Sequence, residues 1–147
     1  MEDHITDESM LKFPDGFIWG AATSHFQVEG HPIEIKNQLS DWSKWASIAG
    51  NIADSTTADA ACDFVSRYLD DIELLSGLNL GALRISLNWA VLCPNDRNGQ
   101  GRKRLNQEGV RYYKKLLSTL KERGITTFVT LFHFCLPQWL AEEGGWL

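Results

Sequence analysis

The sequence has few cysteines, no excess of positive charge and no long hydrophobic run, and these shortages exclude several classes of protein. Its three cysteines, Cys62, Cys93 and Cys135, are an odd number without metal-type spacing, so we predict neither a disulfide framework nor a cysteine metal site. No apolar segment approaches the roughly 20 residues that cross a bilayer, and the acidic start from Met1 to His4 does not resemble a signal peptide. We therefore expect a cytoplasmic protein with no membrane partner, no metal and no cofactor.

Positive charge is scarce, because 14 Lys and Arg residues stand against 19 Asp and Glu residues, which gives a formal net charge of −5. This balance argues against a nucleic-acid partner. The 44% of hydrophobic and 22% of charged residues are ordinary for a soluble globular protein, and 147 residues can bury a sizeable core. Six tryptophans are unusual in so short a chain. Their planar faces suit sugar binding, and core packing explains them equally well.

The stretch from Phe13 to Gly30 contains the most informative pattern in the sequence. A turn at Pro14–Gly16 leads into an apolar run and then into the small residues Gly20 to Ser24. This pattern predicts a buried strand at a crowded place, where a neighbouring backbone or a ligand comes close. The strand is expected to end on a polar group that includes one aromatic residue: His25, Phe26, Gln27 and Glu29. Strand ends of this kind hold ligands in α/β proteins.

Helical and strand-like patterns alternate along the rest of the chain. They predict a helix from Thr56 or Thr57 to Gly77, a strand over 82–89, a helix from Asn106 to Gly124, a strand over 125–134 and a helix after Pro137. Residues 1–12 are expected to form a polar tail, and residues 13–147 the folded part. The long connection over 31–57 holds two tryptophans three residues apart, which favours an ordered segment.

This order of elements predicts an α/β fold with a parallel sheet. The strand over 82–89 alternates apolar and polar residues, whereas the run over 125–134 is nearly continuously apolar, as in a strand covered on both faces. A doubly wound sheet is the alternative, but the first βα turn lacks the Gly-x-Gly-x-x-Gly phosphate loop. The polar inner face of the strand over 82–89 favours a barrel whose interior leads to an active site.

Five segments of the sequence share their order of residues with one known family. They are Phe-Ile-Trp-Gly-Ala-Ala-Thr-Ser-His-Phe-Gln-Val-Glu-Gly at 17–30, Ala61–Tyr68, Arg84–Trp89, Thr130–Pro137 and Gly144–Trp146. Together they closely resemble the N-terminal part of glycoside hydrolase family 1, the β-glucosidase and β-galactosidase family. Ser40–Trp42 with Trp45, and Phe134 where many members have tryptophan, resemble its microbial, thermophile-like branch. Phe64 departs from the family, which usually has a histidine there. The resemblance implies a (β/α)8 TIM barrel, of which this chain would supply strands one to three with their helices.

The resemblance also implies roles for individual residues. Gln27 and His133 would hydrogen-bond the hydroxyls of the terminal sugar, and a site that pairs those hydroxyls rejects analogues that lack one. Arg84 would lie beside the nucleophilic carboxylate and keep it ionised. Trp89 and Phe134 would be wall residues of the substrate site, and Glu29 would form a structural ion pair. Without the resemblance, a lone histidine or arginine in such positions is more often structural.

The two catalytic carboxyls of the family are missing from the sequence. A retaining glycosidase uses one carboxyl as acid/base and another as nucleophile, and the family supplies them from Asn-Glu-Pro and Glu-Asn-Gly segments that do not occur here. We therefore expect the sugar-recognition part of a β-glycosidase for terminal β-D-glucosides or galactosides, which is inactive without a complementary C-terminal β-glycosidase chain. A non-catalytic sugar-binding or regulatory subunit, or a truncated fragment, is the alternative.

Overall fold

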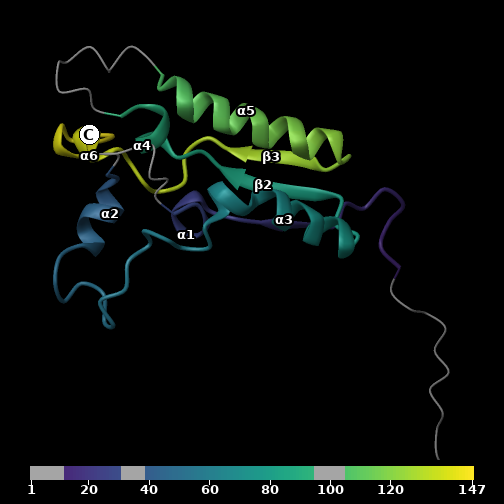
Figure 1. Cartoon of the computed structure of the whole chain (residues 1–147), viewed down its shortest axis with the longest axis horizontal. Coiled ribbons are helices and arrows are strands. Elements are labelled where there is room, and N and C mark those ends of the chain that lie inside the picture. Colours follow the sequence, from purple (N-terminus) through teal and green to yellow (C-terminus); the bar gives the residue numbers. More distant parts are fainter. Residues whose placement is uncertain (1–11, 31–38, 95–104) are drawn as a thin grey trace, which may run out of the picture.

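A computed structural model describes residues 12–30, 39–94 and 105–147 of the chain. Three short strands, β1 (Gly20–Ala22), β2 (Ala82–Ser86) and β3 (Thr126–Thr130), form one parallel sheet in the order β1-β2-β3. Helices lie on each connection between the strands, so the predicted alternation of strands and helices is confirmed (Figure 1). The predicted polar tail falls almost wholly on residues 1–11, which are outside the described part.

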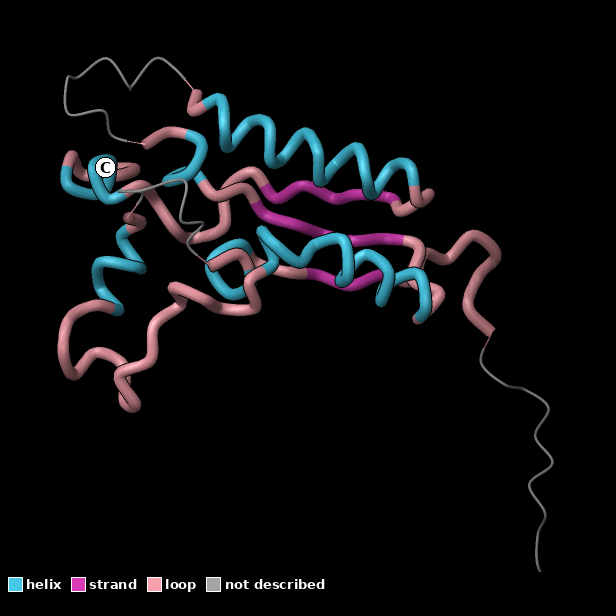
Figure 2. Tube along the Cα trace, viewed as in Figure 1, coloured by secondary structure: helices cyan, strands magenta, loops and turns pink. Residues whose placement is uncertain are grey.

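Two long helices and several short ones accompany the sheet in the described part of the chain. They are α1 (His25–Val28), α2 (Asp41–Ala46), α3 (Phe64–Gly77), α4 (Trp89–Leu92), α5 (Gln107–Glu122) and α6 (Gln138–Glu142). The long helices α3 and α5 run alongside the strands, whereas α2 and α6 lie beyond the ends of β2 and β3 (Figure 2). Across the described residues, no helix combines the length and the apolar character that a bilayer crossing requires.

The hydrophobic core lies between β2 and the two long helices. Leu83 and Ile85 alternate along β2 and contribute one face to it. Ile72 of α3 and the α5 residues Leu116 and Leu120 have no exposed surface and pack in the same cluster. Burial of a side chain of this size contributes roughly 1.5–3 kcal/mol. Alternation along β2 directs Arg84 to the opposite face, which is the polar face predicted from the sequence.

The predicted helix boundaries are correct for α5 and α6, whereas for α3 the predicted end at Gly77 is correct and the predicted start is wrong. The side chain of Asn106 accepts a hydrogen bond from the Glu108 backbone N–H at 3.0 Å, and Gly124 follows α5 with a φ of +71°. By contrast, α3 begins at Phe64 rather than after Thr56 or Thr57. The reason is local backbone geometry, because residues 61 and 63 have φ values of 44° and 53°, which no right-handed helix can contain.

The predicted strands are longer than the observed ones, and the first and third were also predicted to be more buried than they are. Phe17, Ile18 and Trp19 lie outside β1 and are 49%, 54% and 52% exposed, so the expected burial of this run is wrong within the described structure. The strand over 125–134 shortens to Thr126–Thr130, and Phe128 on it is 54% exposed. The strand over 82–89 ends at Ser86 because Asn88 caps α4. An apolar pattern indicates that a strand face can be covered, but it does not say which segment covers it.

The close backbone approach predicted at the small residues of the first strand is confirmed. A Cβ atom added to Gly20 would lie 2.7 Å from the carbonyl oxygen of Ala82 on the neighbouring strand. No side chain fits at that distance without moving a backbone. Glycine at this position therefore sets how tightly β1 pairs with β2.

Candidate functional site

Most of the residues singled out in the sequence follow the carboxyl ends of the three parallel strands, which Figure 1 shows side by side, whereas Arg84 lies within β2. Gln27 lies on α1, directly after β1, and its side chain is exposed. His133 and Phe134 follow β3, and Trp89 begins α4 after β2. Parallel strands bring their carboxyl ends to one edge of a sheet, so three separate parts of the sequence supply side chains to one end of the fold.

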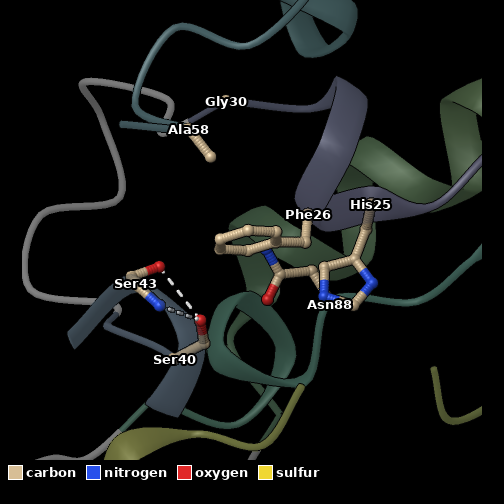
Figure 3. Close-up of a pocket in the computed structure, with 7 residues that line it drawn as sticks. All are labelled: His25, Phe26, Gly30, Ser40, Ser43, Ala58 and Asn88. Atoms are coloured by element: carbon tan, nitrogen blue, oxygen red, sulfur yellow. Dashed lines mark hydrogen bonds between the residues drawn. The ribbon is translucent and has the colours of Figure 1, made fainter. Parts of the chain in front are cut away.

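His25 is buried next to that edge, with only 3% of its surface exposed. Its backbone N–H donates to Ser86 Oγ at 2.9 Å, and its ring Nδ1 lies 2.9 Å from the same oxygen. Burial, followed by the nearby His133, lowers the pKa of His25 to about 4. The imidazole is therefore neutral at physiological pH. Figure 3 shows it beside Phe26 and Asn88 at a small pocket.

Arg84 occupies the middle of the sheet, on the face of β2 opposite the core. Its guanidinium donates to Thr130 Oγ1 of β3 at 3.4 Å, and the residue is half-buried. No carboxylate among the described residues forms an ion pair with it. A cation in this position can lower the pKa of a carboxyl group brought next to it. The position agrees with the role that the sequence predicts for Arg84, and that role stays a prediction.

Glu29 is buried against tyrosine hydroxyls rather than paired with a cation. The Tyr113 hydroxyl lies 2.8 Å from Oε1 and 3.1 Å from Oε2 of Glu29, and the Asn88 backbone N–H donates to the same hydroxyl at 2.8 Å. Burial raises the pKa of Glu29 to about 7, and the hydrogen bond from the Tyr113 hydroxyl opposes that rise. The expected ion pair of Glu29 is not found among the described residues. The carboxyl group is instead held by neutral donors.

An aromatic wall, formed by Phe26, Trp42 and Phe134, stands beside these polar groups. The Trp42 and Phe134 rings stack at 6.3 Å with an interplanar angle of 19°, and Phe26 meets Trp42 edge-on at 5.4 Å. Trp42 is 45% exposed and Phe134 is 67% exposed. Phe134 has a φ of +64°, which is rare for an aromatic residue. Backbone strain of this kind is typical of functional sites, where it holds a side chain in a particular orientation.

Backbone pairing between two distant segments brings Trp42 and Phe134 together. The Asp41 N–H donates to the Leu136 carbonyl at 2.9 Å, and Asp41 Oδ1 accepts from the Leu136 N–H at 2.9 Å. Ser40 and Pro137, which are adjacent to Asp41 and Leu136 in the sequence, form an antiparallel β-bridge. The connection that contains α2 is thus attached to the segment after β3. Helix α2 and this pairing agree with the order predicted for the connection over 31–57, of which residues 31–38 lie outside the described part.

Trp89 belongs to a second aromatic group, away from this wall. Its ring packs edge-on with Phe132 at 5.9 Å and with Trp146 at 5.8 Å, and its indole N–H donates to the Leu131 carbonyl. The ring is half-buried by these contacts. The expected wall role of Trp89 stays a prediction, and in the described structure its role is packing.

Sequence reasoning gave no role to three residues that the structure places at this edge: His25, Ser86 and Trp42. Their signals were present, since His25 ends the first strand pattern and Ser86 lies on the polar face of the second strand. The pocket beside His25 has a volume of about 10 Å³, which is room for one water molecule. A larger, open hollow of about 500 Å³ lies over Asp41, Trp42 and Trp45. The described residues contain no group of three or more side chains that could hold a metal.

Consecutive parallel βα units with polar and aromatic side chains at the carboxyl ends of the strands define part of an α/β-barrel enzyme. Solved structures support this class. A family 1 β-glucosidase from Thermotoga maritima superimposes with a TM-score of 0.83 at 40% identity, over 92% of this chain and 29% of that chain. The same enzyme in complex with deoxynojirimycin gives the same TM-score and identity. The described fold is thus part of a (β/α)8 TIM barrel.

The family model of glycosyl hydrolase family 1 matches residues 9–147, so the chain belongs to this family. The relatives include β-glucosidase A of Thermotoga maritima and of Acetivibrio thermocellus, each 40% identical over 138 residues. β-Glucosidase 42 of Arabidopsis thaliana is 42% identical over 135 residues. The matches cover 94%, 94% and 91% of this chain, and 30%, 30% and 27% of those proteins. The chain therefore spans less than a third of the length of these relatives.

Proposed function

We propose that the chain is the sugar-recognition part of a retaining β-glycosidase that hydrolyses terminal β-D-glucosides or galactosides. Gln27 and His133 bind the hydroxyls of the terminal sugar, and Phe134 and Trp89 shape the walls of its site. Arg84 supports a nucleophilic carboxylate that another chain supplies. The complementary chain carries the remaining strands, the acid/base carboxyl and the nucleophile.

One observation carries this proposal. Polar side chains and an exposed aromatic wall lie together at the carboxyl ends of consecutive strands in a chain of a glycosidase family. Sugars present hydroxyls at their edges and C–H groups on their faces. Hydrogen-bonding side chains such as Gln27 suit the edges, and planar rings such as Phe134 suit the faces.

The need for catalytic carboxyls from outside residues 1–147 is supported by the contacts of two carboxyl groups that lie near the site. Glu29 is buried under Tyr113, and Asp41 accepts hydrogen bonds from the backbone of Leu136 and Trp42. A retaining mechanism requires two carboxyls about 5–5.5 Å apart on either side of the scissile bond. Neither Glu29 nor Asp41 can serve in such a pair while it keeps these contacts.

The test is reconstitution. The 147-residue chain is expressed alone, and together with a segment that carries Asn-Glu-Pro, Glu-Asn-Gly and the remaining strands. We expect self-association and no hydrolysis for the chain alone, because the apolar side chains of Phe128 and Val129 are exposed on β3. With the segment we expect a stable heteromer, with an interface of about 2,000 Å² or more, that hydrolyses an aryl β-glucoside. Size measurement and the hydrolysis assay decide the outcome.

The alternative function is a sugar-binding or regulatory subunit without catalysis, with which the buried contacts of Glu29 and Asp41 are also compatible. Glucose binding by the chain, without hydrolysis in any assembly, would support this alternative. Hydrolysis by a monodisperse monomer of the chain would refute both readings.

A further inference from the structure

The single turn of helix α1, which presents Gln27, is attached to the rest of the fold at both of its ends. At its start, the His25 backbone N–H donates to Ser86 Oγ of β2 at 2.9 Å. At its end, Glu29 follows the helix as its C-cap and is only 5% exposed, whereas the Gln27 side chain between these two residues is exposed. The position of Gln27 therefore depends on what holds His25 and Glu29.

One hydroxyl group, that of Tyr113 on α5, binds the segment after β1 and the segment after β2 at the same time. It accepts the Asn88 backbone N–H at 2.8 Å and lies 2.8 Å from Oε1 of Glu29, to which it donates. A hydroxyl has one proton and two lone pairs. Because Asn88 uses a lone pair, the proton is available to the carboxyl group, and both hydrogen bonds form together.

Close packing fixes the distance over which this hydroxyl reaches. Gly109 precedes Tyr113 by about one turn on α5, and a Cβ atom added to it would lie 2.8 Å from Cγ1 and 3.0 Å from the carbonyl oxygen of Val91 on α4. On the other side, a Cβ atom added to Gly30 would lie 2.6 Å from the Ala60 carbonyl oxygen. The helix that carries the hydroxyl and the segment after α1 are therefore both held by backbone contacts.

We propose that Tyr113 is a positioning residue for Gln27. Its hydroxyl, through Glu29, holds the end of α1 against α4 and α5 and thereby fixes the place of the Gln27 amide at the sugar site. This inference rests on the proposed function, in which Gln27 binds the terminal sugar. Tyr113 is 4% exposed and its hydroxyl is engaged by Asn88 and Glu29, so it acts through these contacts and not by touching the sugar.

Another buried tyrosine provides a matched control. Tyr68 of α3 lies in the same hydrophobic cluster as Tyr113, but its hydroxyl has no hydrogen-bond partner among the described residues. Tyr68→Phe thus removes a buried hydroxyl without removing a hydrogen bond. Tyr113→Phe makes the same chemical change and removes two.

The first test does not depend on activity. Hydrogen exchange of the full chain, followed by mass spectrometry, measures the protection of the backbone over 24–30 and 87–93, which contain α1 and α4. We expect Tyr113→Phe to speed exchange in both segments, because both lose the same attachment, and to leave β3 unchanged. Tyr68→Phe should leave both segments unchanged. Unaltered exchange over 24–30 in a folded Tyr113→Phe variant would overturn the proposal.

Two substitutions at position 29 test the same link from its other side. Glu29→Met removes the acceptor at similar side-chain length, and it is the second route if Tyr113→Phe does not fold. Glu29→Gln keeps an oxygen that accepts from the hydroxyl. At pH 6, below the pKa of about 7 that burial gives Glu29, the carboxyl group is mostly neutral and glutamine is a close match. We expect faster exchange over 24–30 in Glu29→Met and normal exchange in Glu29→Gln. Equal exchange in these two variants would refute the link.

The second test is kinetic and uses the active heteromer with an aryl β-glucoside. We expect Tyr113→Phe to lower kcat/KM by about 2- to 12-fold, the equivalent of one hydrogen bond, and Tyr68→Phe to leave it unchanged. In a Gln27→Ala background, Tyr113→Phe should cause no further loss, because the group that it positions is absent. Equal losses with and without Gln27 would make Tyr113 merely structural and contradict the proposal.

The two tests separate this inference from the proposed function. Absence of hydrolysis in every assembly, together with the expected exchange pattern, would refute the proposed function and leave the attachment of α1 through Tyr113 intact. Hydrolysis with equal losses in both backgrounds would refute only the positioning role.

Discussion

Replacement of Glu29 by glutamine should stabilise the protein at alkaline pH and leave it nearly unchanged at acidic pH. Burial raises the pKa of Glu29 from 4.5 to about 7 in the folded chain, so the folded state binds the proton more tightly than the unfolded state. A carboxyl with a raised pKa contributes stability below about pH 4.5 and loses it as the pH rises through 7. A pKa difference of about 2.5 corresponds to about 3 kcal/mol.

Glutamine at position 29 avoids this loss. Its amide oxygen can still accept from the Tyr113 hydroxyl, which lies 2.8 Å from the present carboxylate, but the side chain never ionises. At pH 8.5 the variant should exceed the unaltered protein by up to about 3 kcal/mol in free energy of unfolding. Near pH 4.5 the two should differ by less than about 1 kcal/mol, because both then bury a neutral group.

The assay is denaturant unfolding at a series of pH values, with the exposed Glu122→Gln as matched control at the end of α5. His25 acts in the opposite sense, because its pKa is lowered to about 4 and the folded state loses stability as the pH falls from 6.5 toward 4. Both proteins carry His25, so its effect cancels in the difference. A difference between Glu29→Gln and the unaltered protein that does not change with pH would refute the reasoning.

Three further predictions concern the site and the sheet. Gln27→Ala and His133→Ala should each lower kcat/KM of the active heteromer by about 5–150-fold, because a buried sugar hydroxyl left without its hydrogen bond costs about 1–3 kcal/mol. The exposed Lys115→Ala is the control and should leave kcat/KM unchanged. Arg84→Met should raise the pKa of the acidic limb of the pH–rate profile, because the nucleophile loses a cation, and an unchanged profile would make the arginine structural. Gly20→Ala should destabilise by more than about 1 kcal/mol because its Cβ would meet backbone, while Gly77→Ala, where nothing lies within 4 Å, should be neutral or stabilising in the same unfolding assay.

Most of the fold could be predicted from the sequence because the signals are local. Asn106 and Gly124 mark the ends of α5 by cap chemistry, and alternation in β2 separates Leu83 from Arg84. The α3 boundary could not be predicted, because the left-handed conformation of Ala61 depends on the surrounding chain and not on its residue type. Exposure of β3 was missed because burial depends on neighbours, which a local pattern does not contain.

The candidate site was only partly predictable. Gln27, His133 and Arg84 could be singled out by residue order and strand position. The contact between Trp42 and Phe134 could not be predicted, because they lie 92 positions apart and their approach depends on the bridge between Ser40 and Pro137. The contact between His25 and Ser86 was also hidden, since the two residues lie 61 positions apart along the chain.

The pairing of residues 39–41 with residues 136–138 has a consequence for exchanging segments between relatives. Most of its hydrogen bonds join backbone groups, and Asp41 contributes a side chain. In a chimera, residues 39–41 could therefore come from one relative and residues 136–138 from another. The two segments would still pair, provided that the aspartate at position 41 is kept. Trp42 and Phe134 could then be varied together as a library, because the joined backbone, rather than either ring, sets their separation. Such a chimera would redesign the aromatic wall while leaving the barrel strands untouched.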